Sequence, residues 1–215
     1  MRTALGDLYS RWYDVQSQET PSDLGARLAL LEQGLRYNPA NLGLMERINR
    51  LMGNESAEAE KARAVLRELL TTGKATASTH FVLGIDAYQR KNLDEARLHW
   101  ERAHELAPEF AVVSNNLAWL LAEGDKADPE RALSLIDAAL KRIPNQPDFR
   151  GTRGHILLRL KRWKEALVEL EAALPATPNN PNLQNDLADA YVGLGLNDLA
   201  KPYRDKAEAP KAEAA

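Results

Sequence analysis

The side chains best suited to metal binding or proton transfer in this sequence are its four histidines, and their spacing favours neither role. His99 and His104 are five residues apart, so on a helix they would diverge by more than a quarter turn and would be poor joint metal ligands. The sequence contains no H-E-x-x-H motif, and serine, histidine and acid never gather in a recognisable nucleophile motif. We therefore interpret His99 and His104 as part of a solvated helix face, and we predict neither catalytic residues nor a metal site.

Other residue types exclude further classes of chemistry. Cysteine is absent, which rules out disulfides, thiolate metal sites and thiol catalysis. Gly151 and Gly154 follow no predicted strand, so a phosphate-binding loop is not expected. Glu169 and Glu171 are two residues apart, so on a helix their carboxylates would point to different faces. We expect no cofactor and no enzymatic activity.

Charge and hydropathy narrow the classes of partner. The net charge is −3 and no basic stripe is visible, which argues against nucleic acid. No stretch approaches 18 uncharged apolar residues, so no membrane span is predicted. Residues 1–7 lack the apolar segment of a signal peptide. A cytoplasmic protein is expected if Met1 is the natural start, whereas the localisation is open if the sequence was cut from a longer chain.

Small residues and prolines recur at fixed distances and reveal an internal repeat. A frame of the form A-x3-bulky-x2-A-x4-P returns after 36 residues and again after 34. A fourth copy begins another 34 residues on, at Ala200, without its proline. A further small residue leads each copy, at Gly84, Ala118, Gly154 and Ala188. The three complete copies are Ala96, Trp100, Ala103, Pro108; Ala132, Ile136, Ala139, Pro144; and Ala166, Leu170, Ala173, Pro178.

Packing explains why these residue types return. Small side chains let two antiparallel helices approach closely, and bulky ones fill the volume that remains between them. A proline just beyond the second helix cannot continue it. Helix starts agree with this register, because Asn92 precedes an acidic first turn, Asp128 precedes Pro129, and Asn197 precedes Asp198. The even-period alternation of strands is absent, so we predict an all-α chain of helical hairpins.

These positions resemble the 34-residue tetratricopeptide repeat. The resemblance implies a right-handed superhelix of antiparallel helical hairpins, with about six hairpins here. Residues 77–180 hold three well-matched repeats, and residues 181–215 hold a last repeat with a polar capping helix and a frayed tail. Residues 1–76 are interpreted as two degenerate hairpins: a helix start is predicted at residues 20–23, and Leu31, Gly34 and Pro39 recover the end of a repeat.

The resemblance also indicates where a partner would bind. In this family the first helices of successive repeats line the inner side of the superhelix, through the second, fifth, ninth, twelfth and thirteenth positions of each repeat. Glu123 also falls on one of these positions. A chaperone-type carboxylate clamp is not expected, because Phe81 and Ile85 stand where lysine and asparagine are needed. The candidate partner-binding residues are Phe81, Ile85, Tyr88, Asn115, Trp119, His155, Arg159, Asn185 and Asp189.

Three functions remain open. The first is a non-catalytic scaffold that binds a peptide segment or helix of another protein in this groove. The second is a regulatory or substrate-selecting module of a larger enzyme or secretion assembly. The third is a structural protein that associates with itself through the ends of the repeat array. An alternative to partner binding for the apolar candidates is packing within the array. In that case Phe81, Ile85 and Tyr88 pack against Asn115 and Trp119 of the next hairpin.

Overall fold

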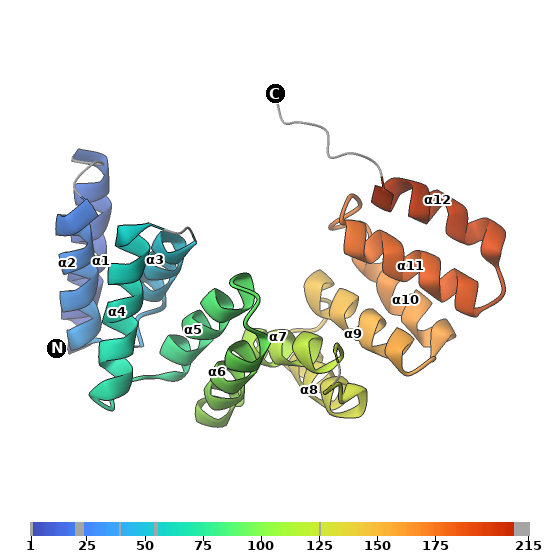
Figure 1. Ribbon diagram of the computed structural model, residues 1–215, viewed down its shortest axis with the longest axis horizontal. Helices are drawn as coiled ribbons and strands as arrows, with labels where there is room; N and C mark the ends of the chain where they lie inside the picture. The colour runs from blue at the N-terminus through green and yellow to red at the C-terminus, as the bar shows by residue number, and fades with distance from the viewer. Residues whose placement is uncertain (1, 20–23, 39, 54–55, 125, 209–215) are drawn as a thin grey trace. The chain divides into compact units, whose positions relative to one another are not determined.

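The computed structural model describes residues 2–19, 24–38, 40–53, 56–124 and 126–208 (Figure 1). The helix start predicted at residues 20–23, Pro39 and the tail at 209–215 lie outside this part of the chain. The described residues form helices and connecting turns, without strands. The helices are α1 Arg2–Glu19, α2 Leu24–Tyr37, α3 Leu42–Met52, α4 Ala57–Thr71, α5 Ala77–Gln89, α6 Leu93–Leu106, α7 Ala111–Leu121, α8 Pro129–Arg142, α9 Pro147–Arg159, α10 Trp163–Ala173, α11 Pro181–Gly193 and α12 Asn197–Glu208.

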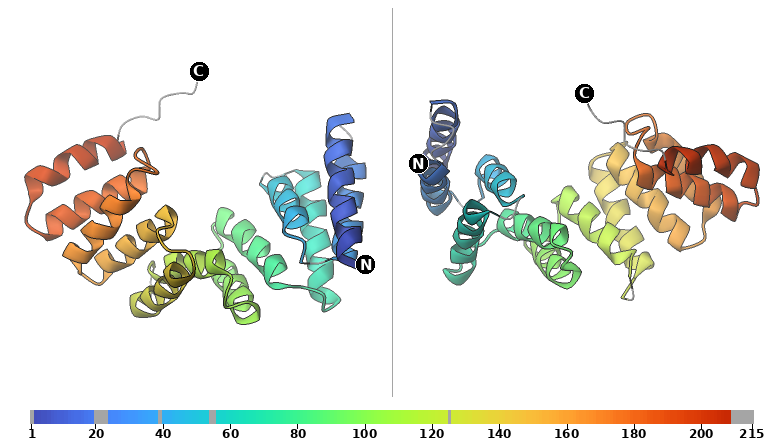
Figure 2. Two further views of the ribbon diagram at one scale, coloured as in Figure 1. Left: turned by 180° about the vertical axis from the view of Figure 1, so that it is seen from behind. Right: turned by 45° about the horizontal axis from the view of Figure 1, so that its top comes forward.

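Successive helices pair into hairpins, from α1 with α2 to α11 with α12. Both views of Figure 2 show the last hairpin with its two helices side by side. The chain divides into two compact units, residues 1–108 and residues 109–215, with three hairpins in each. The predicted all-α class of tetratricopeptide-like hairpins, six in the described residues, is confirmed. The right-handed path of the superhelix stays a prediction, as does the division at residues 76 and 180.

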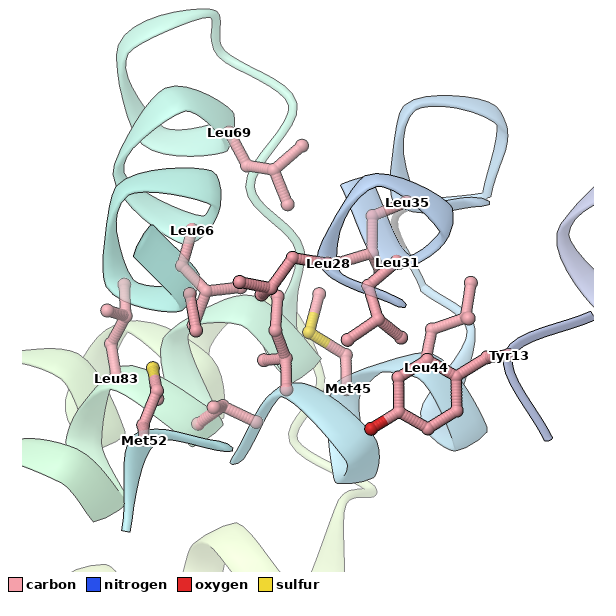
Figure 3. Packing of buried hydrophobic residues seen from close by; sticks show 13 residues of the cluster. Tyr13, Leu28, Leu31, Leu35, Leu44, Met45, Met52, Leu66, Leu69 and Leu83 are labelled. Atoms are coloured by element: carbon pink, nitrogen blue, oxygen red, sulfur yellow. The ribbon is translucent and has the colours of Figure 1, made fainter. Parts of the chain in front are cut away.

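The core of the first unit is built mainly by the two hairpins that match the repeat poorly, with Val82 and Leu83 of α5 added from the third (Figure 3). Leu31, Leu44 and Leu66, on three different helices of this unit, are fully buried in one hydrophobic cluster. Gly34 shows why the frame needs a small residue: a Cβ atom there would lie 2.6 Å from Leu44 Cδ1. The sequence pattern around residues 31–34 therefore reflects real packing although the surrounding repeat is degenerate.

Glycine plays the same role in the well-matched repeats. A Cβ atom on Gly84 would lie 2.3 Å from Trp100 Nε1, so α5 and α6 approach more closely than alanine would allow. The indole N–H of Trp100 donates to the carbonyl oxygen of Phe81 at 3.2 Å, which fixes the register of this hairpin. Gly154 is equally close to Leu170, with 2.5 Å between an added Cβ and Leu170 Cγ. Small and large residues of the frame are thus direct contact partners within these two hairpins.

Two of the three predicted helix starts carry the expected cap in the structure. Asn92 accepts a hydrogen bond from the Glu95 amide and caps α6, and Asp128 caps α8 with Pro129 as its first residue. Both predictions are confirmed. α12 differs, because the helix already includes Asn197 instead of starting after it. It also continues through Pro202, although proline supplies no amide hydrogen to the helix.

A buried ion pair joins α4 to α5 inside the first unit. The guanidinium of Arg63 donates from Nε to Asp86 Oδ1 at 2.9 Å, and both side chains are less than a tenth exposed. Arg63 also donates to the Met52 carbonyl oxygen, and Arg90 donates to the second oxygen of Asp86. The two charges are thus compensated and hydrogen-bonded, which buried charges require. Nothing in the repeat pattern points to this pair.

Candidate functional site

The inward positions of α5 carry three candidate residues of the first unit. Phe81 and Ile85 are half-buried, and Tyr88 is 40% exposed. The ring of Tyr88 lies 5.6 Å from that of Trp100, so it packs against the second helix of its own hairpin. These three side chains therefore present an apolar and aromatic strip on one hairpin, partly held by contacts within that hairpin.

In the second unit, three candidate residues come together. Trp119 of α7 stacks on His155 of α9, with 4.2 Å between ring centroids and an interplanar angle of 28°. Arg159, one helical turn after His155, donates from Nε and Nη2 to Oε1 of Glu123 at 2.9 and 2.6 Å. The same oxygen lies 2.5 Å from His155 Nε2. One contact group is thus formed by Trp119, Glu123, His155 and Arg159. We name this group, together with Asp186, the His155 cluster.

Asp186 completes the His155 cluster from α11. Both of its carboxylate oxygens lie 3.0 Å from His155 Nδ1. His155 is only 5% exposed and is thus held between an acid that follows α7 and an acid on α11. Sequence reasoning did not single out Asp186, because it is 31 residues from His155 and is not on an inward position of the repeat. Only tertiary packing brings the two together.

The electrostatics of the His155 cluster favour a protonated imidazole. Burial alone would lower the pKa of His155, but hydrogen bonds and charges of Asp186 and Glu123 outweigh it and raise that pKa above 6.5. Burial likewise opposes ionisation of Glu123, yet His155 and Arg159 lower the pKa of this carboxyl. When protonated, the imidazole donates to both carboxylates and ties the turn after α7 to α11 through α9.

A cavity of about 190 Å³ opens beside the His155 cluster within the second unit. Its wall includes Trp119 from α7, Asp148 and Gly151 from α9, and Asn182 and Asp186 from α11. The lining thus combines one large aromatic ring with carboxylates, two side-chain amides and the backbone at a glycine. Such a mixture suits recognition of a polar or extended chain, in which apolar contact supplies affinity and polar groups set orientation.

The other candidates do not join this arrangement. Asn115 donates from its amide to Asn116. Asn185 is exposed on α11. Asp189, also exposed, pairs with Arg204 of α12 at 3.1 Å. Among the candidate residues of the second unit, the structure therefore joins Trp119, His155 and Arg159, whereas Asn115, Asn185 and Asp189 make other contacts or are exposed.

The described residues include all four histidines of the chain, and the sequence has no cysteine. Within these residues, no group of three or more histidine, cysteine or acidic side chains could hold a metal ion. None of the described helices combines the length and apolar character that a membrane crossing requires.

Two histidines differ from their sequence-based interpretation, because His104 as well as His99 is half-buried. His99 was expected on a solvated helix face, yet it is half-buried and lies against His80 of α5, with 3.0 Å between the two Nδ1 atoms. The spacing of His99 and His104 along one helix gave no signal of this contact, because the partner lies on the preceding helix, 19 residues away.

Known proteins share these repeats. Tetratricopeptide repeat models match residues 77–110 and residues 120–188. Anaphase-promoting complex subunit 3 of Schizosaccharomyces pombe is 26% identical over 153 residues. The match covers 70% of this chain but 23% of that protein, so the chain spans about a quarter of the length of this relative.

Solved structures show the same fold. PilF of Pseudomonas aeruginosa superposes with a TM-score of 0.66 and 19% identity, covering 94% of this chain and 90% of PilF. MamA of Desulfovibrio magneticus RS-1 superposes with a TM-score of 0.61 and 15% identity, covering 78% and 93% of the two chains. At these identities the likeness concerns the fold alone. With the repeat frame, the hairpins and the two family matches in agreement, residues 77–110 and 120–188 are tetratricopeptide repeats, and the described chain has the fold of such repeats.

Proposed function

We propose that this chain is a non-catalytic protein-interaction scaffold that binds a peptide segment or helix of a partner at the inward face of α7, α9 and α11. The tetratricopeptide repeats support an interaction role in general. The observation that carries the finer proposal is the cavity beside the His155 cluster, because it adjoins an aromatic ring that is already held in place.

The energetics of such a site depend on preorganisation. Stacking on His155 restricts the ring of Trp119 before a partner arrives, so little side-chain entropy remains to be lost on binding. Asn182 and Asp148 are exposed at the rim of the cavity and can pair with backbone or side-chain groups of a bound segment. A rigid aromatic anchor surrounded by polar groups is the composition typical of binding hot spots.

Site-specific photo-crosslinking tests this proposal and does not require the partner to be identified first. A photoreactive amino acid replaces Asn182 at the cavity, and the matched control places it at Lys164, which is exposed on α10 of the same unit. We expect a defined crosslinked protein from the source cell at residue 182 and not at residue 164. Equal crosslinking at both positions, or none at residue 182, would contradict the proposal.

The affinity for the captured partner then measures how much the side chain of Trp119 contributes to binding. Trp119→Ala is expected to weaken binding by about 30-fold or more, the loss typical of a hot-spot aromatic residue. Because Trp119 also stabilises His155, the exposed variant Asn182→Arg serves as a second probe that leaves the His155 cluster intact. Val168→Ala, at a 62% exposed position of α10, is the control with unchanged binding. Full affinity in both cavity variants, with helical circular dichroism preserved, would exclude this face as the binding site.

A module of a larger assembly is the second candidate. The yeast relative is by name a subunit of a complex, and this chain matches only part of it. We propose this alternative on that observation alone. The native mass of the endogenous protein tests this alternative. A mass that corresponds to a stable complex would support it, and the mass of the chain alone would contradict it.

A further inference from the structure

His80 and His99 face each other across the α5/α6 hairpin, in the first unit and on residues that the proposed function does not use. Their Nδ1 atoms are 3.0 Å apart, their ring centroids are 5.3 Å apart, and the rings are tilted by 47°. Both side chains are half-buried, so each keeps part of its surface in contact with solvent. Two ring nitrogens at this separation either share one hydrogen bond or point at a common ligand.

The backbone holds the pair in a fixed register. Phe81 directly follows His80 and Trp100 directly follows His99, and the Trp100 indole donates to the Phe81 carbonyl oxygen. The close approach of Gly84 to Trp100 holds the same two helices together one turn later. A capping box formed by Thr76 with Thr79 secures the first turn of α5. Only side-chain torsions therefore remain free to adjust the distance between the two imidazoles.

The protonation state suits metal binding, because a neutral imidazole is the ligand form. Burial, with smaller effects from the neighbouring imidazole and from Arg102, lowers the pKa of His80 to about 4. Burial also lowers the pKa of His99, where Glu95 and Arg90 act in opposite directions. Arg102 is ion-paired with Glu105 at 2.8 Å, which offsets part of its charge near the pair.

We propose that His80 and His99 form a two-histidine binding site for a divalent transition-metal ion of the Zn²⁺ or Cu²⁺ type. Each ring would bind through Nδ1 and carry its single proton on Nε2, so binding needs a change of tautomer but no net loss of protons from the pair. At a tetrahedral Zn²⁺ with bonds of about 2.0–2.1 Å, two ligand nitrogens lie about 3.3–3.4 Å apart. The pair at 3.0 Å would thus open by a few tenths of an ångström, within the reach of small torsional changes.

The donor set defines the ligand class. Imidazole nitrogen prefers Zn²⁺, Cu²⁺ and Ni²⁺ over Mg²⁺ and Ca²⁺, which bind oxygen, and Cu²⁺ is expected to bind most tightly. Within the described residues, no third histidine, cysteine or acid joins the pair in a metal-binding group, so water completes the coordination. An open site of this kind is independent of the cavity beside the His155 cluster.

Calorimetric titration of the full chain, after removal of bound metal with a chelator, tests the site. ZnCl₂ and CuSO₄ are expected to bind at one equivalent per chain. His80→Gln and His99→Gln should each weaken this binding at least tenfold. His104→Gln, on the same helix as His99 but outside the pair, should leave it unchanged, and MgCl₂ should give no heat of binding. Circular dichroism of each variant verifies that the hairpin is folded.

A spectroscopic measurement locates the ion. Substoichiometric Cu²⁺ should broaden the ring signals of His80 and His99 in the NMR spectrum before those of His104 and His155. Unchanged Zn²⁺ and Cu²⁺ binding in the double variant His80→Gln/His99→Gln, or an absence of binding in the wild-type chain, would overturn the proposal. Neither result depends on whether Trp119 and Asn182 bind a partner.

Discussion

At the scale of single residues, identical side chains behave differently because their neighbours differ. His155 is buried and His80 is half-buried, and burial alone would lower the pKa of each. Two carboxylates reverse this effect at His155, whereas His80 faces another imidazole and an arginine. The first histidine is therefore favoured as a cation and the second as a neutral ring.

The raised pKa of His155 predicts a pH dependence of stability. A folded-state pKa above the unfolded value means that the stabilisation is complete below about pH 6.5 and is lost as the pH rises through the folded value. The urea midpoint of the wild type should exceed that of His155→Gln by more at about pH 6 than at about pH 8.5. NMR titration of the ring should give a pKa above 6.5, and a value at or below 6.5 would contradict the assignment.

The ion pair of Arg63 and Asp86 predicts a large effect of one substitution. Asp86→Ala leaves Arg63 buried without its partner and also removes the acceptor of Arg90, so unfolding should become easier by about 3–5 kcal/mol. Glu60→Gln removes the other acid at Arg63 from a side chain that is 62% exposed and should cost less than about 1 kcal/mol. Urea unfolding measures both. Similar losses of stability in the two variants would show that the effect of Asp86→Ala does not come from the burial of its ion pair with Arg63.

At the scale of the helix, α9 offers a matched pair of glycines. A Cβ atom on Gly154 would collide with Leu170, whereas one on Gly151 would have Ala173 Cβ as its nearest neighbour at 3.9 Å. Gly154→Ala should destabilise the protein by about 1–3 kcal/mol through overpacking. Gly151→Ala should be neutral or stabilise it by up to about 1 kcal/mol, because alanine is the better helix former.

Thermal or urea unfolding of these two variants tests the assignment of the repeat frame as packing positions. The Gly154 position belongs to the recurrent small residue of the frame, and Gly151 does not. Equal losses of stability in both alanine variants would contradict this assignment. They would show that the close approach of α9 to α10 is not the reason for a glycine at residue 154.

At the scale of the whole molecule, the chain consists of two compact units that meet in sequence at Pro108 and Glu109. Each contains complete hairpins, and repeat arrays derive their stability from single repeats and from contacts between neighbours. A fragment of residues 109–215 should therefore be helical and unfold cooperatively in urea, and it should keep the pH dependence of the His155 cluster. A fragment that is unfolded by circular dichroism would show that the second unit needs the first.

The sequence determined the class of fold through short-range packing rules. The repeat frame has a small residue at 84, a bulky one at 100 and a proline at 108. These types recur because the two helices of each hairpin must approach closely. Such rules act over about one repeat, so they are visible as spacing along the chain. They also located Trp119, His155 and Arg159 on neighbouring first helices, through the resemblance to the family.

Tertiary structure decided what these residues do to one another. Asp186 reaches His155 across 31 residues, Asp86 reaches Arg63 across 23, and His80 reaches His99 across 19. In each of these contacts at least one partner lies outside the recurrent positions of the repeat, so the periodicity of the sequence does not reveal the contact. Their physical cause is that a charge or imidazole removed from water must find a partner wherever the folded chain supplies one. The spacing of residues thus fixes the hairpins, whereas the ionisation of the histidines depends on neighbours that only the packed hairpins bring close.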